Sequence, residues 1–326
     1  MDPVQKKRGI YSIGGFLKHA HELRVLWSPP YLSRLWCVFE LAAYRKANPS
    51  GRITLAPLFI EHSVLLCMVA LWGASWCYWV VLTSGAFSTE LEHIFPLCIA
   101  VLPILGFVHG LRHFFREKHQ LFVTLRHFQL SFATCSEPFD KQFVHDAVQA
   151  WYGSTEEFEQ FVQGPLFQEV SGSEAASADV RLAYCLLLCT GPICACIDES
   201  VSLWLGGAPS AAVLSSVIGH VYSIGLCWSL VTVKLLYLLC DRYAVARIGF
   251  PSCMQTWLAH TAVCACFLAG SFTGEIAYRH SLSAAIVHAC ATTLVACVSY
   301  GWSWLSQRWM SSGGSKSDGH LSTTKS

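Results

Sequence analysis

The chain's most chemically versatile side chains gather between positions 28 and 41, where hydroxyls, a thiol, an indole and a carboxylate lie close together. They are Ser28, Tyr31, Ser33, Trp36, Cys37 and Glu40. A carboxylate can stabilise a developing positive charge or exchange a proton. A thiol becomes a nucleophile only where its pKa is depressed and water reaches it. We therefore take Glu40 as the candidate reactive group and expect Cys37 to be buried.

The surrounding residues predict short strands and helices in alternation. A polar helix is expected over 16–22 and an apolar strand over 23–27. Ser33 is suited to cap a helix that runs to about residue 47, before Pro49. The apolar run 53–60 predicts a buried strand, with Pro57 as an alternative end. This alternation is typical of a parallel α/β sheet.

The same residues carry a resemblance to a known family. Ser28, Tyr31, Ser33, Trp36, Cys37, Glu40 and Leu41 match the pattern S-x-x-Y-x-S-x-x-W-C-x-x-E-L. This pattern resembles Toll/interleukin-1 receptor (TIR) domains, and the two flanking strands are similar to the third and fourth strands of that fold. The resemblance covers about 50 of the 326 residues. A half-domain joined to a multi-pass membrane region is similar to arrangements in protist membrane proteins.

The resemblance implies a role for Glu40. In enzymatic TIR domains the matching glutamate is the catalytic residue of NAD cleavage, and a carboxylate near the ribose can stabilise an oxocarbenium-like charge. The family builds its cofactor pocket from a first strand and the following loop, and only 22 residues precede Leu23. We therefore expect a structural Glu40, which shares a helix face with Trp36 and Tyr44. Its expected role is to cap, to pair with Arg34 or Arg45, or to orient a neighbouring backbone group. NAD is the cofactor only under the enzymatic alternative; otherwise no cofactor is expected.

The composition predicts a membrane protein. Hydrophobic residues make up 53% of the chain and charged residues 13%, about half the usual charged share. The net charge of +1 gives no basic footprint for nucleic acid. Because the 16 cysteines lie mostly in apolar runs, they indicate small hydrophobes rather than disulfides. Six apolar segments are long enough to span a bilayer, at 63–82, 94–111, 182–205, 212–236, 257–277 and 282–305.

Basic residues predict the orientation of these spans. Segments 1–62, 112–181, 237–256 and 306–326 hold nine, six, two and three Lys or Arg. The three intervening loops hold one in total, Arg279. Cytosolic loops are enriched in Lys and Arg. The alternation therefore places both termini in the cytosol.

Segment 112–181 is long enough to fold by itself. We expect 112–128 to continue the second span as a helix. Phe139, Phe143, Ala147 and Trp151 recur every four residues and predict an amphipathic helix over 140–152, ended by Gly153. Ser154 and Glu157 form a capping box that opens a second helix, with Gly164-Pro165 as its stop. This module is suited to docking on the α/β fragment, on the membrane surface or on its own chain.

Ionisable residues inside spans are functional candidates by default. Only His220 and His288 lie deep in the predicted spans, and we expect them to be hydrogen-bonded packing residues. Cysteine and histidine pairs two residues apart do not face each other on a helix, so no metal site is predicted. Gly270-x-x-x-Gly274 is suited to close helix packing.

The sequence thus predicts a mainly α, polytopic membrane protein with a small α/β TIR-like fragment. Its segments are 1–62 (α/β fragment), 63–111 (transmembrane hairpin), 112–181 (helical module), 182–305 (four-helix transmembrane region) and 306–326 (disordered tail). The favoured function is a non-enzymatic signalling, scaffold or interaction protein whose partners are the bilayer and a cytosolic protein or a second copy. The alternatives are a membrane-tethered NAD hydrolase and a channel or transporter.

Overall fold

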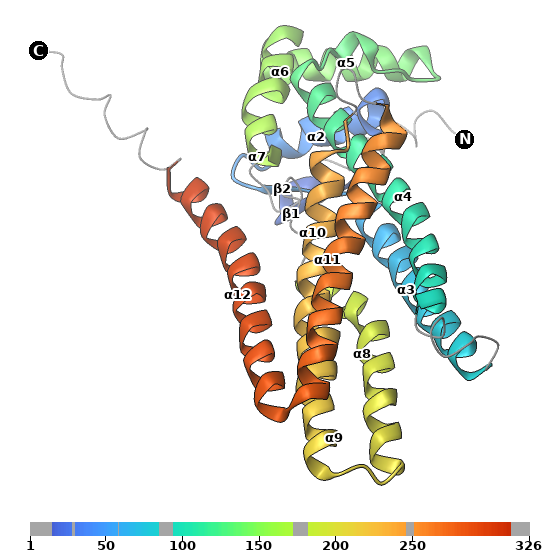
Figure 1. Ribbon diagram of the computed structural model, residues 1–326. Helices are drawn as coiled ribbons and strands as arrows, with labels where there is room; N and C mark the ends of the chain where they lie inside the picture. Colours follow the sequence, from blue (N-terminus) through green and yellow to red (C-terminus); the bar gives the residue numbers. More distant parts are fainter. Residues whose placement is uncertain are drawn as a thin grey trace, which may run out of the picture. The chain divides into compact units, whose positions relative to one another are not determined.

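The computed structural model describes residues 15–27, 30–57, 59–84, 94–171, 182–245 and 251–313, and these are mainly helical (Figure 1). The chain divides into two compact units. The first, here the α/β unit, comprises residues 1–60 and 116–177; the second, here the bundle, comprises 61–115 and 178–326. The segment around the candidate motif and most of the predicted helical module therefore belong to one unit.

The α/β unit contains a parallel pair of strands, as the sequence predicts. Strand β1 (Glu22–Trp27) pairs with β2 (Arg52–Pro57), with Leu23 opposite Ile53. Among the described residues before β1, helix covers 15–19, which corrects the predicted 16–22, because Glu22 already pairs in the sheet. Strand β2 ends at Pro57, the earlier of the two ends that the sequence allows, since proline has no N–H to continue a ladder.

Between the strands lie a 3-10 turn, η1 (Tyr31–Ser33), and helix α2 (Leu35–Ala47). The prediction that Ser33 caps this helix is wrong. Arg34 occupies the N-cap position without a side-chain cap, and the Ser33 hydroxyl instead donates to the Pro30 carbonyl at 2.8 Å. Ser33 lies in the preceding turn, one residue too early to reach the free N–H groups of α2.

The rest of the α/β unit is helical. It contains the end of α4 (Ile94–Arg126), then η2 (Leu130–Phe132), α5 (Pro138–Tyr152), α6 (Thr155–Phe161), η3 (Val162–Leu166) and α7 (Phe167–Ser171). Helix α4 confirms the predicted continuation beyond residue 112. Gly153 ends α5 with a φ of 91°, and Ser154 accepts from the Glu157 N–H at 3.1 Å, which confirms the predicted cap. The predicted stop at Gly164-Pro165 is wrong. The backbone passes through it in a π turn, and π turns absorb a local irregularity without ending a helix.

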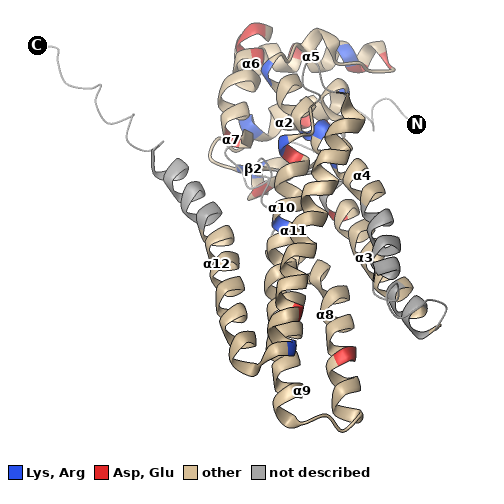
Figure 2. Cartoon of the chain, in the orientation of Figure 1, with Lys and Arg blue, Asp and Glu red and all other residues tan. Residues whose placement is uncertain are grey.

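The bundle is built from α3 (Phe59–Thr83), the first part of α4, and the chain from residue 182 onward. That chain forms α8 (Leu182–Leu205), a continuous rod made of α9 (Ser210–Ser216), η5 (Val217–Trp228) and α10 (Ser229–Arg242), then α11 (Ser252–His280) and α12 (Leu282–Gly313). Charged side chains are sparse along these helices (Figure 2).

Four helices are long and apolar enough to cross a membrane: Leu182–Leu205, Ser210–Arg242, Ser252–His280 and Leu282–Gly301. The first coincides with a predicted span, and the next two extend beyond theirs because flanking polar residues continue the helix. The segments 63–82 and 94–111, predicted as the first two spans, fall within α3 and α4. The predicted tail 306–326 overlaps the end of α12, and its residues beyond 313 lie outside the described part of the chain.

Two glycines allow α11 to pack closely on the π-helical segment η5, as expected from their spacing. A Cβ at Gly270 would lie 1.9 Å from the Trp228 ring, and one at Gly274 would lie 2.6 Å from the Ile224 side chain. The Trp228 indole donates to the Cys266 carbonyl at 3.0 Å, which fixes the ring over Gly270. Any larger residue at position 270 would push the two helices apart.

Candidate functional site

The structure places the described motif residues on η1 and α2, and it uses most of them for internal contacts. Ser28 lies outside the described residues. The Trp36 indole donates to Oδ2 of Asp140 on α5 at 3.1 Å. Trp36 also packs against Phe39 and Phe143, with ring centroids 5.4 and 6.4 Å apart. Trp36 thus joins α2 to α5.

The aromatic contact continues along α5. Phe39 packs against Phe143 and Trp151 at centroid distances of 5.7 and 5.4 Å. The Tyr152 hydroxyl donates to the Ala42 carbonyl at 3.1 Å, and burial raises the pKa of Tyr152 to about 12. Phe139 is 48% exposed although it shares the predicted stripe, while the fully buried positions on this helix are Asp140, Val144 and Val148. The buried face is therefore rotated by one residue, because α2 meets α5 on the side of Asp140.

The two hydroxyl-bearing motif residues hold backbone in place. The Tyr31 hydroxyl donates to the Cys37 carbonyl at 3.4 Å, and burial is the main cause of the raised pKa of Tyr31. The Ser33 carbonyl accepts from the N–H of Thr134 at 2.7 Å, and the Leu35 N–H donates to the Thr134 carbonyl at 3.1 Å. Residues 33–35 and Thr134 thus form a short parallel bridge, centred on Arg34.

Cys37 is 8% exposed, and burial raises the pKa of its thiol. A buried thiol with a raised pKa is a poor nucleophile. The expectation that Cys37 is inert therefore agrees with its position.

Glu40 differs from Trp36 and Cys37, because its side chain is exposed. It makes no hydrogen bond or ion pair with any residue in the described ranges. Partial desolvation raises the pKa of its carboxyl, and the nearby positive charge of Arg34 opposes that rise. The expected ion pair with Arg34 or Arg45 is therefore not formed within the described part of the chain.

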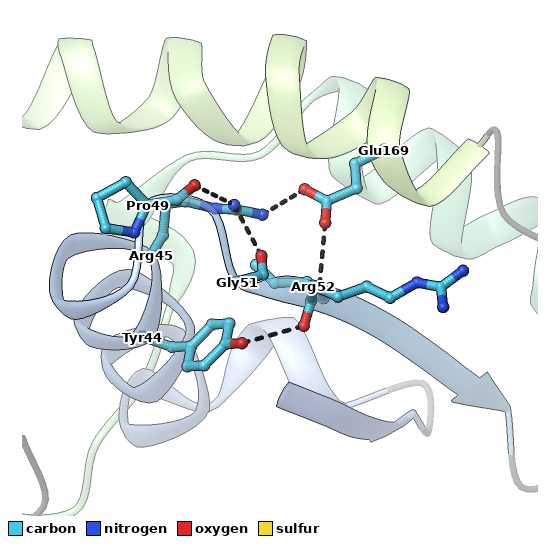
Figure 3. Close-up of polar contacts among 7 residues, drawn as sticks. Tyr44, Arg45, Pro49, Gly51, Arg52 and Glu169 are labelled. Atoms are coloured by element: carbon cyan, nitrogen blue, oxygen red, sulfur yellow. Dashed lines mark hydrogen bonds and ion pairs between the residues drawn. The ribbon is translucent and has the colours of Figure 1, made fainter. Parts of the chain in front are cut away.

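Arg45 pairs instead with Glu169 on α7 (Figure 3). Its guanidinium also donates to the carbonyls of Pro49 and Gly51 at 2.8 and 3.0 Å. The second carboxylate oxygen of Glu169 accepts from the Ile53 N–H of β2 at 3.0 Å. The Glu169 carboxylate thus accepts hydrogen bonds both from a side chain of α2 and from a backbone N–H of β2. This contact docks the end of the helical module on the α/β fragment, one of the three options left open by the sequence.

A second polar group lies in the bundle, and sequence reasoning missed it. The Tyr278 hydroxyl donates to Oε1 of Glu199 at 2.9 Å, and Nδ1 of His220 lies 3.2 Å from Oε2 of the same carboxylate. His288 lies 2.7 Å from the Ser223 hydroxyl. The sequence singled out both histidines, but not their partners, which come from other helices and are separated by as many as 79 residues.

No group of three His, Cys, Asp or Glu suited to holding a metal occurs in the ranges that the structure describes. Comparison with protein-family models, with curated proteins and with solved structures finds no match for this chain. The similarity to TIR domains therefore stands on the motif residues and their two strands alone.

Proposed function

We propose that the chain is an integral membrane protein with six spans, whose TIR-like α/β unit is a non-enzymatic interaction scaffold on the cytosolic side. The observation that carries this proposal is how the motif residues are used. The side chains of Trp36 and Tyr31 donate to Asp140 and to the Cys37 carbonyl, and the backbone carbonyl of Ser33 accepts from Thr134 of the same unit. Side chains that are engaged in packing are not free to position a nucleotide.

The membrane part of the proposal rests on the four apolar helices and on the distribution of charge. The two further spans lie in α3 and α4. The basic residues concentrate in alternate segments, which favours a cytosolic location for both termini and for the α/β unit. The partner is a cytosolic protein or a second copy of this chain.

Glu40 marks the surface on which a partner would bind. Its neighbours on α2, Phe39 and Leu41, are buried, whereas Glu40 is exposed and makes no hydrogen bond or ion pair with the described residues. An exposed carboxylate on a rigid helix is available for a charged contact with another chain. A photo-crosslinking amino acid placed at Glu40 tests this in native membranes. Glu156, exposed on α6, is the matched control position. The proposal predicts a discrete adduct from position 40 and none from position 156; equal adducts, or none from position 40, would contradict it.

The enzymatic alternative is favoured by the same exposure, since a catalytic carboxylate must reach its substrate. A membrane-tethered NAD hydrolase acting through Glu40 would consume NAD, and loss of its carboxylate would abolish turnover. An assay of NAD consumption by the purified chain thus distinguishes the scaffold from the enzyme.

The proposed topology has its own test. An N-glycosylation acceptor on an inserted flexible linker is placed either between α8 and α9, near Gly207, or between α5 and α6, near Gly153. The native chain has no acceptor, because its one asparagine stands in Asn48-Pro49-Ser50. Six spans predict glycosylation of the insertion near Gly207 alone. Glycosylation near Gly153 would contradict the proposed orientation.

A further inference from the structure

Three helices of the bundle bring proton-exchanging groups together around one carboxylate. Glu199 belongs to α8, His220 to η5 and Tyr278 to α11. The Tyr278 hydroxyl donates to one oxygen of Glu199 at 2.9 Å, and Nδ1 of His220 lies 3.2 Å from the other. The imidazole and phenol rings stack, with centroids 5.2 Å apart and planes 9° from parallel.

Burial of His220 opposes a proton on its ring, and the carboxylate of Glu199 favours one. The other charged groups that face His220 are Glu275 and Arg279 on α11. These two pair with each other at 2.6 Å, so their charges cancel. With a neutral imidazole the cluster carries one net negative charge, which is costly inside a membrane-spanning bundle. A proton on His220 would neutralise the cluster.

A second hydrogen-bonded group lies one turn further along the same helix. Ser223 lies three residues beyond His220, a rise of about 4.5 Å at helical spacing. Its buried hydroxyl is 2.7 Å from Nδ1 of His288 and 2.8 Å from the hydroxyl of Thr292, both on α12. Nε2 of His288 lies 3.3 Å from the Thr273 hydroxyl on α11. Because both ring nitrogens have partners, this imidazole can accept a proton at one nitrogen and release it at the other.

A π-helical backbone and two glycines make room for these rings. His220 and Ser223 both lie in the π-helical segment Val217–Trp228, and π-helical turns occur frequently at functional sites. A Cβ at Gly219 would lie 2.4 Å from Cβ of Tyr278, and one at Gly274 would lie 2.9 Å from the His288 ring. Glycine is thus required where each aromatic ring approaches a neighbouring helix.

We propose that this line of side chains is a proton pathway into the bundle, here called the proton line. Glu199, His220 and Tyr278 form its entry, and Ser223, His288 and Thr292 form its next step. Within each of the two groups one proton moves from an N–H or O–H to the lone pair of the acceptor in contact with it, so no redox partner is needed. The proposal rests on the bundle spanning a membrane, which the glycosylation test decides separately.

The test is proton flux through the full-length protein in liposomes. A pH-sensitive dye is enclosed, and a potassium diffusion potential drives protons inward. The wild type is expected to acidify the lumen faster than protein-free vesicles, and Glu199→Gln and His288→Gln are expected to reduce the protein-dependent rate at least tenfold. His260→Gln replaces a buried histidine of the same bundle that lies outside the proton line, and it should keep the wild-type rate.

Several outcomes would overturn the proposal. They are a wild-type rate equal to that of protein-free vesicles, unchanged flux in Glu199→Gln and His288→Gln, or a current carried by Na⁺ at constant pH. If Glu199→Gln elutes as misfolded protein, Tyr278→Phe replaces it, because this change removes only the hydroxyl that donates to Glu199. Tyr278→Phe is expected to lower the protein-dependent proton flux by the same tenfold. A wild-type flux in this variant would contradict the role of Glu199, His220 and Tyr278 as the entry.

Discussion

The Trp36 indole nitrogen donates a hydrogen bond to Oδ2 of Asp140 at 3.1 Å, across 104 residues of sequence. Asp140 is 4% exposed, so this contact lies inside the α/β unit rather than on its surface. It joins the helix of the TIR-like motif to a helix from a distant segment. The most distinctive residue of the motif therefore has a packing role.

Replacement of Trp36 by phenylalanine is expected to weaken the contact between α2 and α5. The variant keeps an aromatic ring against Phe39 and Phe143 but leaves Asp140 with one donor fewer, at a cost of about 1–3 kcal/mol. Hydrogen exchange of the α2 and α5 amides in the full-length protein measures this change in local opening free energy. Trp151→Phe is the control, because Trp151 packs on Phe39 and its indole makes no hydrogen bond within the described ranges. An equal loss in both variants would show that ring size, and not the hydrogen bond, matters.

The ion pair of Arg45 with Glu169 is expected to stabilise β2. Both side chains are partly exposed, so solvent screening limits the coupling to about 1 kcal/mol. A double-mutant cycle with Arg45→Ala and Glu169→Ala, read from exchange of the β2 amides, measures it. Pairing Arg45→Ala with Glu156→Ala on α6 provides the control cycle. A coupling no larger than that of the control would mean that Glu169 acts through the Ile53 N–H alone.

Replacing each of two glycines of the bundle by alanine is expected to change the stability of the protein in opposite directions. Gly270→Ala forces a methyl group into the fixed Trp228 ring and should destabilise the protein by about 1–3 kcal/mol. A Cβ at Gly301 would meet nothing within 4 Å, and the added helix propensity should stabilise by about 0.5–1 kcal/mol. Thermal unfolding in detergent compares the two variants. A stabilised Gly270→Ala protein would contradict the close packing of α11 on η5.

Alkylation should distinguish a structural Cys37 from a reactive one. Its burial and raised pKa reduce the thiolate fraction at neutral pH. We expect iodoacetamide to modify Cys37 at least about tenfold more slowly than the less buried Cys135 of the same unit. The rate at Cys37 should rise as pH increases toward its raised pKa, since the thiolate is the attacking form. Peptide mass spectrometry measures both sites, and faster labelling of Cys37 would show an activated thiol.

The sequence predicted those elements whose signal is local. The apolar runs around Val25 and Ile53 indicated two parallel strands, and the Ser154 cap and Gly153 indicated one helix boundary, because each depends on residues a few positions apart. The failures were also local. Ser33 is a residue type that commonly caps helices, but it lies in a 3-10 turn. Pro165 lies in a π turn, and the helical backbone continues past it.

Contacts between distant helices could not be predicted. Arg112 was counted as an ordinary basic residue of a loop, yet it is 2% exposed and donates to the carbonyls of Tyr243 and Ser252 at distances from 2.5 to 2.9 Å. Nothing in the spacing of Glu199 indicated Tyr278 as its partner. Such partners depend on how the helices pack, and one sequence carries no direct signal of that.

The measurement that tests the account most directly is NAD consumption by the purified full-length protein, wild type beside Glu40→Gln. Glutamine keeps the size of the side chain and removes its charge. The account predicts no turnover above buffer in either protein, because the motif residues of α2 serve packing and leave Glu40 for contact with another chain. Turnover by the wild type that is lost in Glu40→Gln would contradict the account and establish a membrane-tethered NAD hydrolase.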